Sequence, residues 1–299
     1  MPEYRVSETR QPHAMDEAAA PASPAGTDRA DRIAELSPER RLLLQRLLEE
    51  RAGARRAATS PRIRRRQGDG PVPLSFAQQR LWFIDQLEPG SSAYNMPFPM
   101  RVRGALDPRV LRRALGEIAR RHESLRTVFA VVDGEPVQTV RPPAPARLPV
   151  VDLAGLEGEA REREARRLAD DDSLRGFDLA RGPLLRSTLV RLAERESAVL
   201  FTMHHIVSDG WSLGVLVREV SVLYAAFARG APSPLPELPL QYPDFAVWQR
   251  EHVSGARLEE QIRYWKGRLA DAPPLLELPT DRPRPPVEDP RGAMAVFVV

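Results

Sequence analysis

The chain of 299 residues contains no cysteine. This absence excludes disulfides, thiolate metal ligands and a cysteine nucleophile. Lysine is nearly absent as well, because Lys266 is the only one, so arginine supplies almost all of the positive charge. Acidic residues offset these arginines and leave a formal net charge of only +3. This balance argues against a surface dedicated to nucleic acid.

Long apolar runs are also missing. No run is long enough to cross a membrane, and no charged segment followed by an apolar one opens the chain as a secretory signal would. We therefore expect a cytoplasmic protein without a membrane partner. The hydrophobic share of 42% is enough to bury a core, and the length corresponds to about two domains at roughly 150 residues each.

The most distinctive segment is MHHIVSDGWS at residues 203–212. A β-prone apolar run precedes it at residues 198–202, and apolar residues recur every three or four positions from Leu213 to Phe227. The segment is therefore predicted to join the end of a strand to the start of a helix. In α/β proteins, active-site side chains are often held at such a place.

The N-terminal part of the chain is predicted to lie outside the folded body. Residues 1–30 are rich in Ala, Pro, Glu and Arg without apolar periodicity, which indicates disorder. Residues 31–70 are predicted to hold a short leader helix capped by Ser37, followed by a basic linker. The simplest interpretation of the linker arginines, which include Arg66, is a solvated tether.

The folded body is predicted at residues 71–270, where helical and strand patterns alternate. A proline-rich crossing linker follows at residues 271–290, and residues 291–299 form an apolar β-run. An unpaired apolar edge of this kind is prone to aggregation, so we expect residues 291–299 to be the first strand of a second lobe that is missing here.

Capping signals and periodicity place the elements of the body. Ser75 is predicted to cap a helix whose apolar face includes Phe76, Leu81 and Phe83 or Ile84. Asp107 and Pro108 open a second helix, and Asp133-Gly134 forms a hairpin turn. Further helices are predicted around residues 157–172, 213–230, 242–248 and 258–269, and strands at residues 128–132, 136–140, 184–192 and 197–203.

The paired histidines are candidates for acid–base chemistry. Successive side chains of a strand point to opposite faces, so we expect one of His204 and His205 to pack inside while the other faces a cavity. A neutral histidine can accept a proton from an amine or hydroxyl nucleophile. Asp209 can orient the loop or pair with an arginine, and Gly210 lets a backbone N–H approach a developing oxyanion. The alternative is a buried histidine pair at a tight turn without a catalytic role.

A metal site is a further alternative. His205 and Asp209 would share one face if the segment were helical, and imidazole with carboxylate suits zinc or iron. However, a strand precedes them, Gly210 follows, and no third ligand lies nearby in the sequence. His122 and His252 are isolated and are expected to be surface or structural residues. We therefore expect no bound metal.

Four segments resemble the core motifs of condensation domains from nonribosomal peptide synthetases. HHIVSDG at residues 204–210 matches the HHxxxDG motif of that family. SFAQQRLWF at 75–83, RHESLRTVF at 121–129 and YPDFAVW at 242–248 resemble its first, second and fourth motifs, in the family's order. LSPER at 36–40 resembles the leader often found ahead of such domains. One HHxxxD alone is weak support, whereas four ordered motifs over residues 70–299 are specific.

The resemblance implies an α/β fold like that of chloramphenicol acetyltransferase, in which two similar lobes enclose a tunnel with the reactive histidine. This sequence would supply the first lobe, a mixed sheet flanked by helices, and the later motifs of the second lobe are absent. By resemblance, His205 is catalytic, His204 and Asp209 are mainly structural, and Gly210 supplies backbone polarity near the thioester oxygen. The family pairs this aspartate with an arginine that the sequence does not place. Trp211 and Ser212, which follow the motif, are expected to contact substrate.

The implied reaction is amide formation in the secondary metabolism that makes peptide antibiotics. The α-amine of an aminoacyl group on a downstream carrier protein attacks the thioester of an acyl or peptidyl group on an upstream carrier. Both substrates are held on 4'-phosphopantetheine arms, and the domain itself is expected to bind no cofactor. The implied partners are the two peptidyl carrier proteins and an adjacent adenylation domain.

Several narrower questions stay open at this point. The residues around the first and third motifs resemble domains that join two L-residues, but a starter-type domain that accepts a fatty acyl group is the alternative. An acyltransferase with the HxxxxD spacing of glycerophosphate acyltransferases and a non-catalytic module that docks carrier proteins are others. Because the second lobe would supply half of the tunnel, we expect the isolated chain to have little or no activity.

Overall fold

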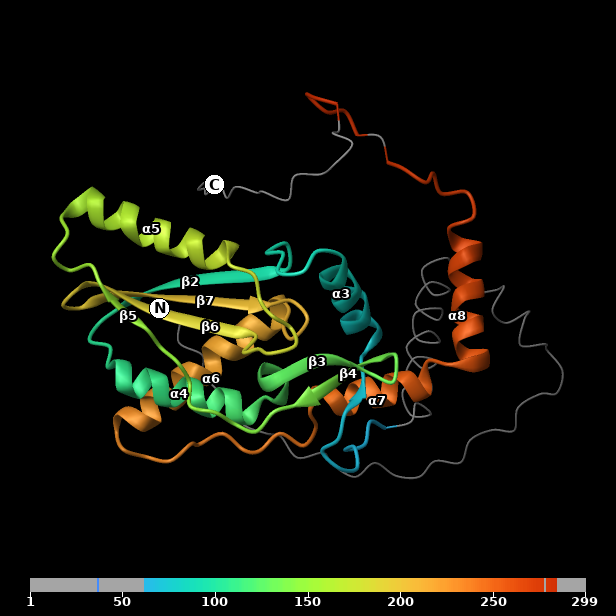
Figure 1. Ribbon diagram of the computed structural model, residues 1–299, viewed down its shortest axis with the longest axis horizontal. Helices are drawn as coiled ribbons and strands as arrows, with labels where there is room; N and C mark the ends of the chain where they lie inside the picture. Colours follow the sequence, from blue (N-terminus) through green and yellow to red (C-terminus); the bar gives the residue numbers. More distant parts are fainter. Residues whose placement is uncertain (1–36, 38–61, 277, 284–299) are drawn as a thin grey trace. The chain divides into compact units, whose positions relative to one another are not determined.

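The computed structural model describes Ser37, residues 62–276 and residues 278–283 (Figure 1). The predicted disordered N-terminus, most of the leader helix and the strand at residues 291–299 lie outside the described residues. The chain divides into two compact units, Met1–Ser60 and Pro61–Val299, and every described helix and strand belongs to the second.

A four-stranded mixed sheet is the centre of this unit. Its strand order is β2 (Asn95–Arg103), β7 (Glu196–His204), β6 (Leu185–Ala193) and β5 (Val150–Asp152). β7 pairs antiparallel with both β2 and β6, whereas β5 runs parallel to β6. The expected mixed sheet flanked by helices is therefore confirmed.

Helices cover both faces of this sheet (Figure 1). Helices α4 (Pro108–Arg121) and α6 (Gly210–Ala228) lie on one face, and α5 (Gly158–Leu174) lies on the other. The residues of β7 alternate accordingly. Phe201 and Met203 enter the core cluster with α4 and α6, whereas Leu200 enters a separate cluster with residues of α5. The period of two along β7 thus decides which helix each side chain meets.

Helix α6 is the longest described helix and the most apolar in character. Its 19 residues meet the length and composition that a membrane span requires, contrary to the expectation from the sequence. It is the only such helix among the described residues. Its buried side chains pack against α4 and the sheet in the main core, so their hydrophobicity is explained by the fold. They are Leu216, Val220, Leu223, Ala226 and Phe227.

A second, three-stranded sheet has the order β1 (Val72–Pro73), β4 (Glu135–Val140) and β3 (Thr127–Val132), preceded by the 3₁₀ helix η1 (Glu123–Arg126). The predicted hairpin between β3 and β4 is confirmed. Asp133 and Gly134 both have positive φ, at 51° and 84°, as a two-residue turn between twisted strands requires.

Helix α3 (Phe76–Leu87) begins at the predicted cap. The Ser75 hydroxyl accepts from the Gln78 N–H, and the Gln78 side chain accepts in turn from the Ser75 N–H. The predicted apolar face was only partly right. Leu81 is buried, but Phe83 is 58% exposed.

Strands β2 and β5 were not predicted from the sequence. β2 contains Pro97 and Pro99, which lack the N–H that a strand needs for pairing. The structure resolves this conflict by placing β2 at the edge of the sheet. The two prolines are two residues apart, so their nitrogens point to the same, unpaired side. β5 has only three residues, too few to give a periodic signal.

The last two helices differ in how they are held. In α7 (Tyr242–His252), the Tyr242 hydroxyl lies 2.9 Å from the Ser75 hydroxyl, and Gln249 accepts from the Phe76 N–H at 2.9 Å. These bonds tie α7 to the start of α3. By contrast, no residue of α8 (Gly255–Arg268) is buried. The described part of the proline-rich linker after α8 has no helix or strand.

The interpretation of the basic linker as a solvated tether was wrong for Arg66. Its side chain is 7% exposed and forms ion pairs with Glu123 at 2.8 Å and Asp244 at 3.1 Å. The Arg66 N–H also donates to Asp244. Glu123 belongs to the predicted second motif and Asp244 to the fourth, so one linker arginine joins two distant motifs.

Candidate functional site

The two motif histidines lie where the sequence predicted, between a strand and a helix. His204 is the last residue of β7, a turn follows, and α6 begins at Gly210. His204 is 3% exposed, whereas His205 is exposed. The prediction that one of the two histidines packs inside is therefore confirmed for His204.

His204 is held in a dry environment. Its Nδ1 accepts from the Ile206 N–H at 3.1 Å, and its ring meets the edge of the Phe177 ring at a centroid distance of 6.0 Å. Burial, with a smaller contribution from the positive charge of a protonated His205, lowers the pKa of His204 from 6.5 to about 4. His204 is therefore neutral at physiological pH, and the bond to Ile206 shapes the turn that carries His205.

His205 is fixed through its backbone and leaves its ring accessible. Its N–H donates to the Tyr94 carbonyl at 2.9 Å, just before β2 begins. Two surface hollows of the described chain do not include His205 in their lining. One hollow lies along α8 and another lies at the other end of the sheet, near Arg103 and Glu196. The residue itself is exposed in the described structure.

Asp209 serves as the N-cap of α6. Its carboxylate accepts from the Ser212 N–H at 2.8 Å and from the Ser212 hydroxyl at 2.6 Å, and this hydroxyl accepts from the Asp209 N–H. The Ser212 hydrogen bonds and, to a smaller extent, His205 lower the pKa of Asp209. Within the described ranges, Asp209 forms no ion pair with an arginine. The hydroxyl of Ser212, expected to contact substrate, is occupied by the cap.

Gly210 and Trp211 form the exposed first turn of α6. Trp211 is 85% exposed. No described acceptor binds the Gly210 N–H. This group lies at the N-terminus of a 19-residue helix, which is the positive end of the helix dipole. A Cβ atom added at Gly210 would meet nothing within 4 Å. The described chain therefore leaves open space beside this glycine.

A metal centre finds no support in the described residues. They contain no group of three or more His, Asp or Glu side chains that could hold an ion. His122, which the sequence suggested was isolated, lies 2.7 Å from Glu219 on α6, and Arg121 donates to the same carboxylate oxygen at 3.0 Å. Hydrogen bonds from His122 and Arg121 outweigh burial and lower the pKa of Glu219. This cluster joins α4 to α6.

Motifs far apart in the sequence meet around Gln241 and Arg66. The Gln241 side chain donates to the Arg121 carbonyl at 2.9 Å and accepts from the Glu123 N–H at 3.1 Å. With the Arg66 ion pairs, these contacts join the second and fourth motifs into one partly buried polar network. No periodic pattern in the sequence signals such contacts, because they depend on tertiary pairing.

Comparison with known proteins identifies the family. The sequence profile described as "Condensation domain" matches residues 69–297. A linear gramicidin synthase of Brevibacillus parabrevis is 50% identical over 225 residues, which cover 75% of this chain and 3% of that protein. Phosphinothricin tripeptide synthetase PhsC of Streptomyces viridochromogenes is 45% identical over 272 residues, 91% of this chain and 25% of that protein.

Solved structures agree. The first condensation domain of the CDA synthetase has a TM-score of 0.64 and 27% identity, covering 71% of this chain and 53% of that one. The X-domain from teicoplanin biosynthesis has a TM-score of 0.65 and 32% identity, covering 75% and 49%. The chain thus spans about half the length of these structures. Sequence and fold together show that this chain belongs to the condensation-domain family of nonribosomal peptide synthetases.

Proposed function

We propose that the chain supplies the His205-bearing half of an amide-forming acyltransferase. The α-amine of a carrier-bound aminoacyl group attacks the thioester carbonyl of an upstream carrier-bound acyl or peptidyl group. A C–N bond forms, the C–S bond breaks, and the donor phosphopantetheine thiol is released. His205 accepts or orients the amine proton, which is a modest task because a free α-amine has a pKa near 8.

The division of labour between the two histidines carries this proposal. His205 is exposed and anchored by its N–H to Tyr94, so its ring is available to substrates. His204 is 3% exposed and its Nδ1 is occupied by Ile206. We assign His204 and Asp209 to shaping the turn and capping α6, which supports the catalytic group without contacting the reacting atoms.

Gly210 is proposed to stabilise the developing oxyanion. Its N–H has no described acceptor and lies at the N-terminus of α6, where the helix dipole favours negative charge. Trp211, beside it, is the exposed apolar group proposed to contact the substrate arms. Ser212 is proposed to act through the cap rather than through substrate, given its bonds to Asp209.

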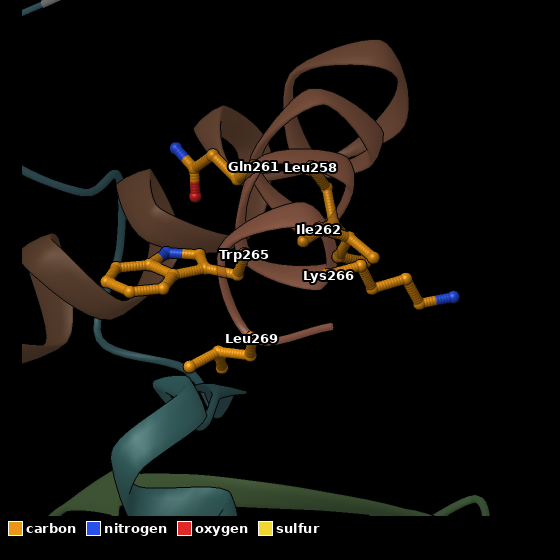
Figure 2. Close-up of a pocket in the computed structure, with 6 residues that line it drawn as sticks. All are labelled: Leu258, Gln261, Ile262, Trp265, Lys266 and Leu269. Carbon is orange, nitrogen blue, oxygen red and sulfur yellow. The ribbon is translucent and has the colours of Figure 1, made fainter. Parts of the chain in front are cut away.

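A complete site requires the other half of the condensation fold. Helix α8 supports this requirement, because Leu258, Ile262 and Trp265, with Leu269 at the C-cap, follow the spacing of a helical stripe. Ile262, Trp265 and Leu269 are 45%, 59% and 57% exposed. They border a shallow hollow of about 560 Å³ (Figure 2), whose lining is Leu258, Gln261, Ile262, Trp265, Lys266 and Leu269. A stripe of this kind is normally covered, and we propose that the isolated chain has little or no activity.

Partners follow from the reaction. The two substrates arrive on 4'-phosphopantetheine arms of upstream and downstream peptidyl carrier proteins, next to an adenylation domain, in the cytoplasm. The DGWS segment favours the joining of two L-residues, and a starter-type reaction with a fatty acyl donor is the alternative. A non-catalytic binding role is the other alternative, since one structural relative is the complex of the X-domain and OxyB from teicoplanin biosynthesis.

The test uses the chain extended through the C-terminal half of a condensation domain. Donor carriers are loaded with L-aminoacyl or fatty acyl groups, acceptor carriers with L-aminoacyl groups, and products are weighed by intact-protein mass spectrometry. A dipeptidyl thioester on the acceptor supports the proposal, and an N-acyl product alone identifies the starter reaction. Binding of both carriers without any product would contradict the catalytic function and favour the docking role.

A further inference from the structure

The face of the sheet behind the histidines carries a second polar cluster. In the paired register, Asn95 of β2 lies opposite His204 of β7, and Arg186 of β6 lies opposite Thr202 of β7. His204 and Thr202 are two residues apart and share the face that α5 covers. The C-terminal end of α5 lies over this cluster, since the Thr202 hydroxyl donates to the Asp172 carboxylate.

Arg186 binds the end of α5 through several hydrogen bonds. Its Nη2 donates to the carbonyls of Asp172 at 2.8 Å and Arg175 at 2.6 Å, and its Nη1 donates to that of Gly176 at 3.1 Å. Its Nε donates to the Asp172 carboxylate at 3.2 Å. The last carbonyls of a helix have no partner within the helix, so Arg186 supplies the donors that they lack.

Asn95 binds the same group of carbonyls from the neighbouring strand. Its side-chain nitrogen donates to Ser173 at 2.6 Å and to Arg175 at 3.0 Å. The segment between Asp172 and Phe177 is therefore held from two strands of the sheet. It also packs closely against the backbone of Gly90, because a Cβ atom at Gly176 would lie 2.0 Å from the Gly90 carbonyl oxygen.

Arg186 and Asn95 are each connected to one of the two histidines through a single intervening residue. The Arg186 guanidinium lies 3.7 Å from the centroid of the Phe177 ring, and that ring meets His204 edge-on. Asn95 directly follows Tyr94, whose carbonyl accepts the His205 N–H. The end of α5 is thus connected to the ring of His204 and to the backbone of His205.

We propose that Arg186 and Asn95 are positioning residues of the active site, which fix His204 through Phe177 and His205 through Tyr94 by holding the C-terminal end of α5. The proposed role of both residues is exerted through their contacts with the α5 end and not through the substrates. The inference rests on the proposed function only in that it makes this geometry relevant to catalysis. The contacts themselves can be tested without any substrate.

The test is histidine NMR on the full chain with labelled imidazole rings, together with amide exchange at His205. In the wild type, we expect His204 to carry its proton on Nε2 and to stay neutral down to about pH 4. Arg186→Met should admit water beside Phe177 and move the His204 pKa toward 6.5. Asn95→Asp keeps the shape but replaces a donor by an acceptor facing two carbonyls, and should accelerate His205 amide exchange about tenfold.

Arg191→Met is the matched control on the same strand. Arg191 pairs with Asp152, is 48% exposed and has no described contact with α5, so its replacement should leave both histidines unchanged. If Arg186→Met fails to fold, Arg186→Lys is the second variant. It retains the positive charge but lacks the planar set of guanidinium donors, and it should move the His204 pKa in the same direction by a smaller amount.

A folded Arg186 variant with an unchanged His204 titration, together with Asn95→Asp with unchanged His205 exchange, would overturn the proposal. These readouts do not depend on turnover. Failure of amide formation in the extended chain would therefore contradict the proposed function and leave this inference standing. Unchanged histidine measurements in the variants, with amide formation intact, would overturn this inference and leave the proposed function standing.

Discussion

Helices α4 and α8 have the same length of 14 residues and the same kind of amphipathic pattern, but only one of them has its apolar face covered. In α4, Leu111, Ala114, Leu115 and Ile118 are between 0% and 4% exposed. In α8, no residue is buried. The comparison teaches that periodicity predicts a helix and its apolar face but does not tell whether the described part of the chain covers that face.

The largest effect is expected for Ile118→Ala in the covered helix. Ile118 of α4 is fully buried in the core that this helix forms with α6 and the sheet. Its truncation should therefore leave a cavity and lower the free energy of unfolding by about 2–5 kcal/mol. Urea unfolding followed by circular dichroism measures the change. A loss below about 1 kcal/mol would show that α4 is not packed as described.

A second expectation concerns His204, the titratable group buried on the opposite face of the sheet from α4. Its pKa is lowered from 6.5 to about 4 in the folded state, so the unfolded chain binds the additional proton between these pH values. Stability from this group is complete above pH 6.5 and is lost as pH falls toward 4, by up to about 3 kcal/mol. The difference between the wild type and His204→Asn, measured from pH 7 to 4, isolates this contribution.

His205→Asn is the matched control for that titration, because His205 is exposed and contributes only a secondary effect on its neighbour. The steep loss of stability should persist in His205→Asn. If His204→Asn shows the same slope as the wild type, burial of His204 is not the cause.

Two glycines should respond differently to the addition of one methyl group. In Gly176→Ala, the new Cβ would lie 2.0 Å from the Gly90 carbonyl oxygen, so the segment beside Phe177 must shift, at a cost of about 1–3 kcal/mol. In Gly210→Ala, nothing lies within 4 Å, and no steric loss is expected. Thermal unfolding of both variants tests this contrast, and equal midpoints would contradict the close approach at Gly176.

The smallest effect on stability is expected on the bare helix. Ile262→Ala in α8 should change the free energy of unfolding of this chain by no more than about 0.5 kcal/mol, because Ile262 is already 45% exposed. In the chain extended through the second half of the fold, the same substitution should cost clearly more. An equal and negligible effect in both proteins would show that the α8 stripe is not covered there.

Much of the fold could be predicted from local signals. Asp107 with Pro108, Ser75 with Gln78, and Asp133 with Gly134 each satisfy a local requirement of backbone geometry, so the elements they start or join were found in place. Strand β2 was missed because the acceptable position of its prolines depends on its being an edge strand. That property belongs to the sheet and not to the segment.

The positions of the site histidines were predicted from the sequence, but the contacts that hold the site in place were not. The burial of one of the two histidines follows from strand geometry and was correct for His204. The buried role of Arg66, the cap formed by Ser212, and the binding of the α5 end by Arg186 could not be read from spacing. Each depends on residues that tertiary pairing brings together, and a single sequence holds no signal for such pairs.

The central claim is that His205 is the working residue of a condensation site of which this chain forms one half. The most direct measurement compares dipeptidyl thioester formation by the extended chain with that of its His205→Ala variant. We predict a loss of about 10²–10⁴-fold in turnover with an unchanged unfolding midpoint, since the His205 side chain is exposed. Equal turnover by the two folded proteins would contradict the claim and would mean that binding and orientation alone produce the amide.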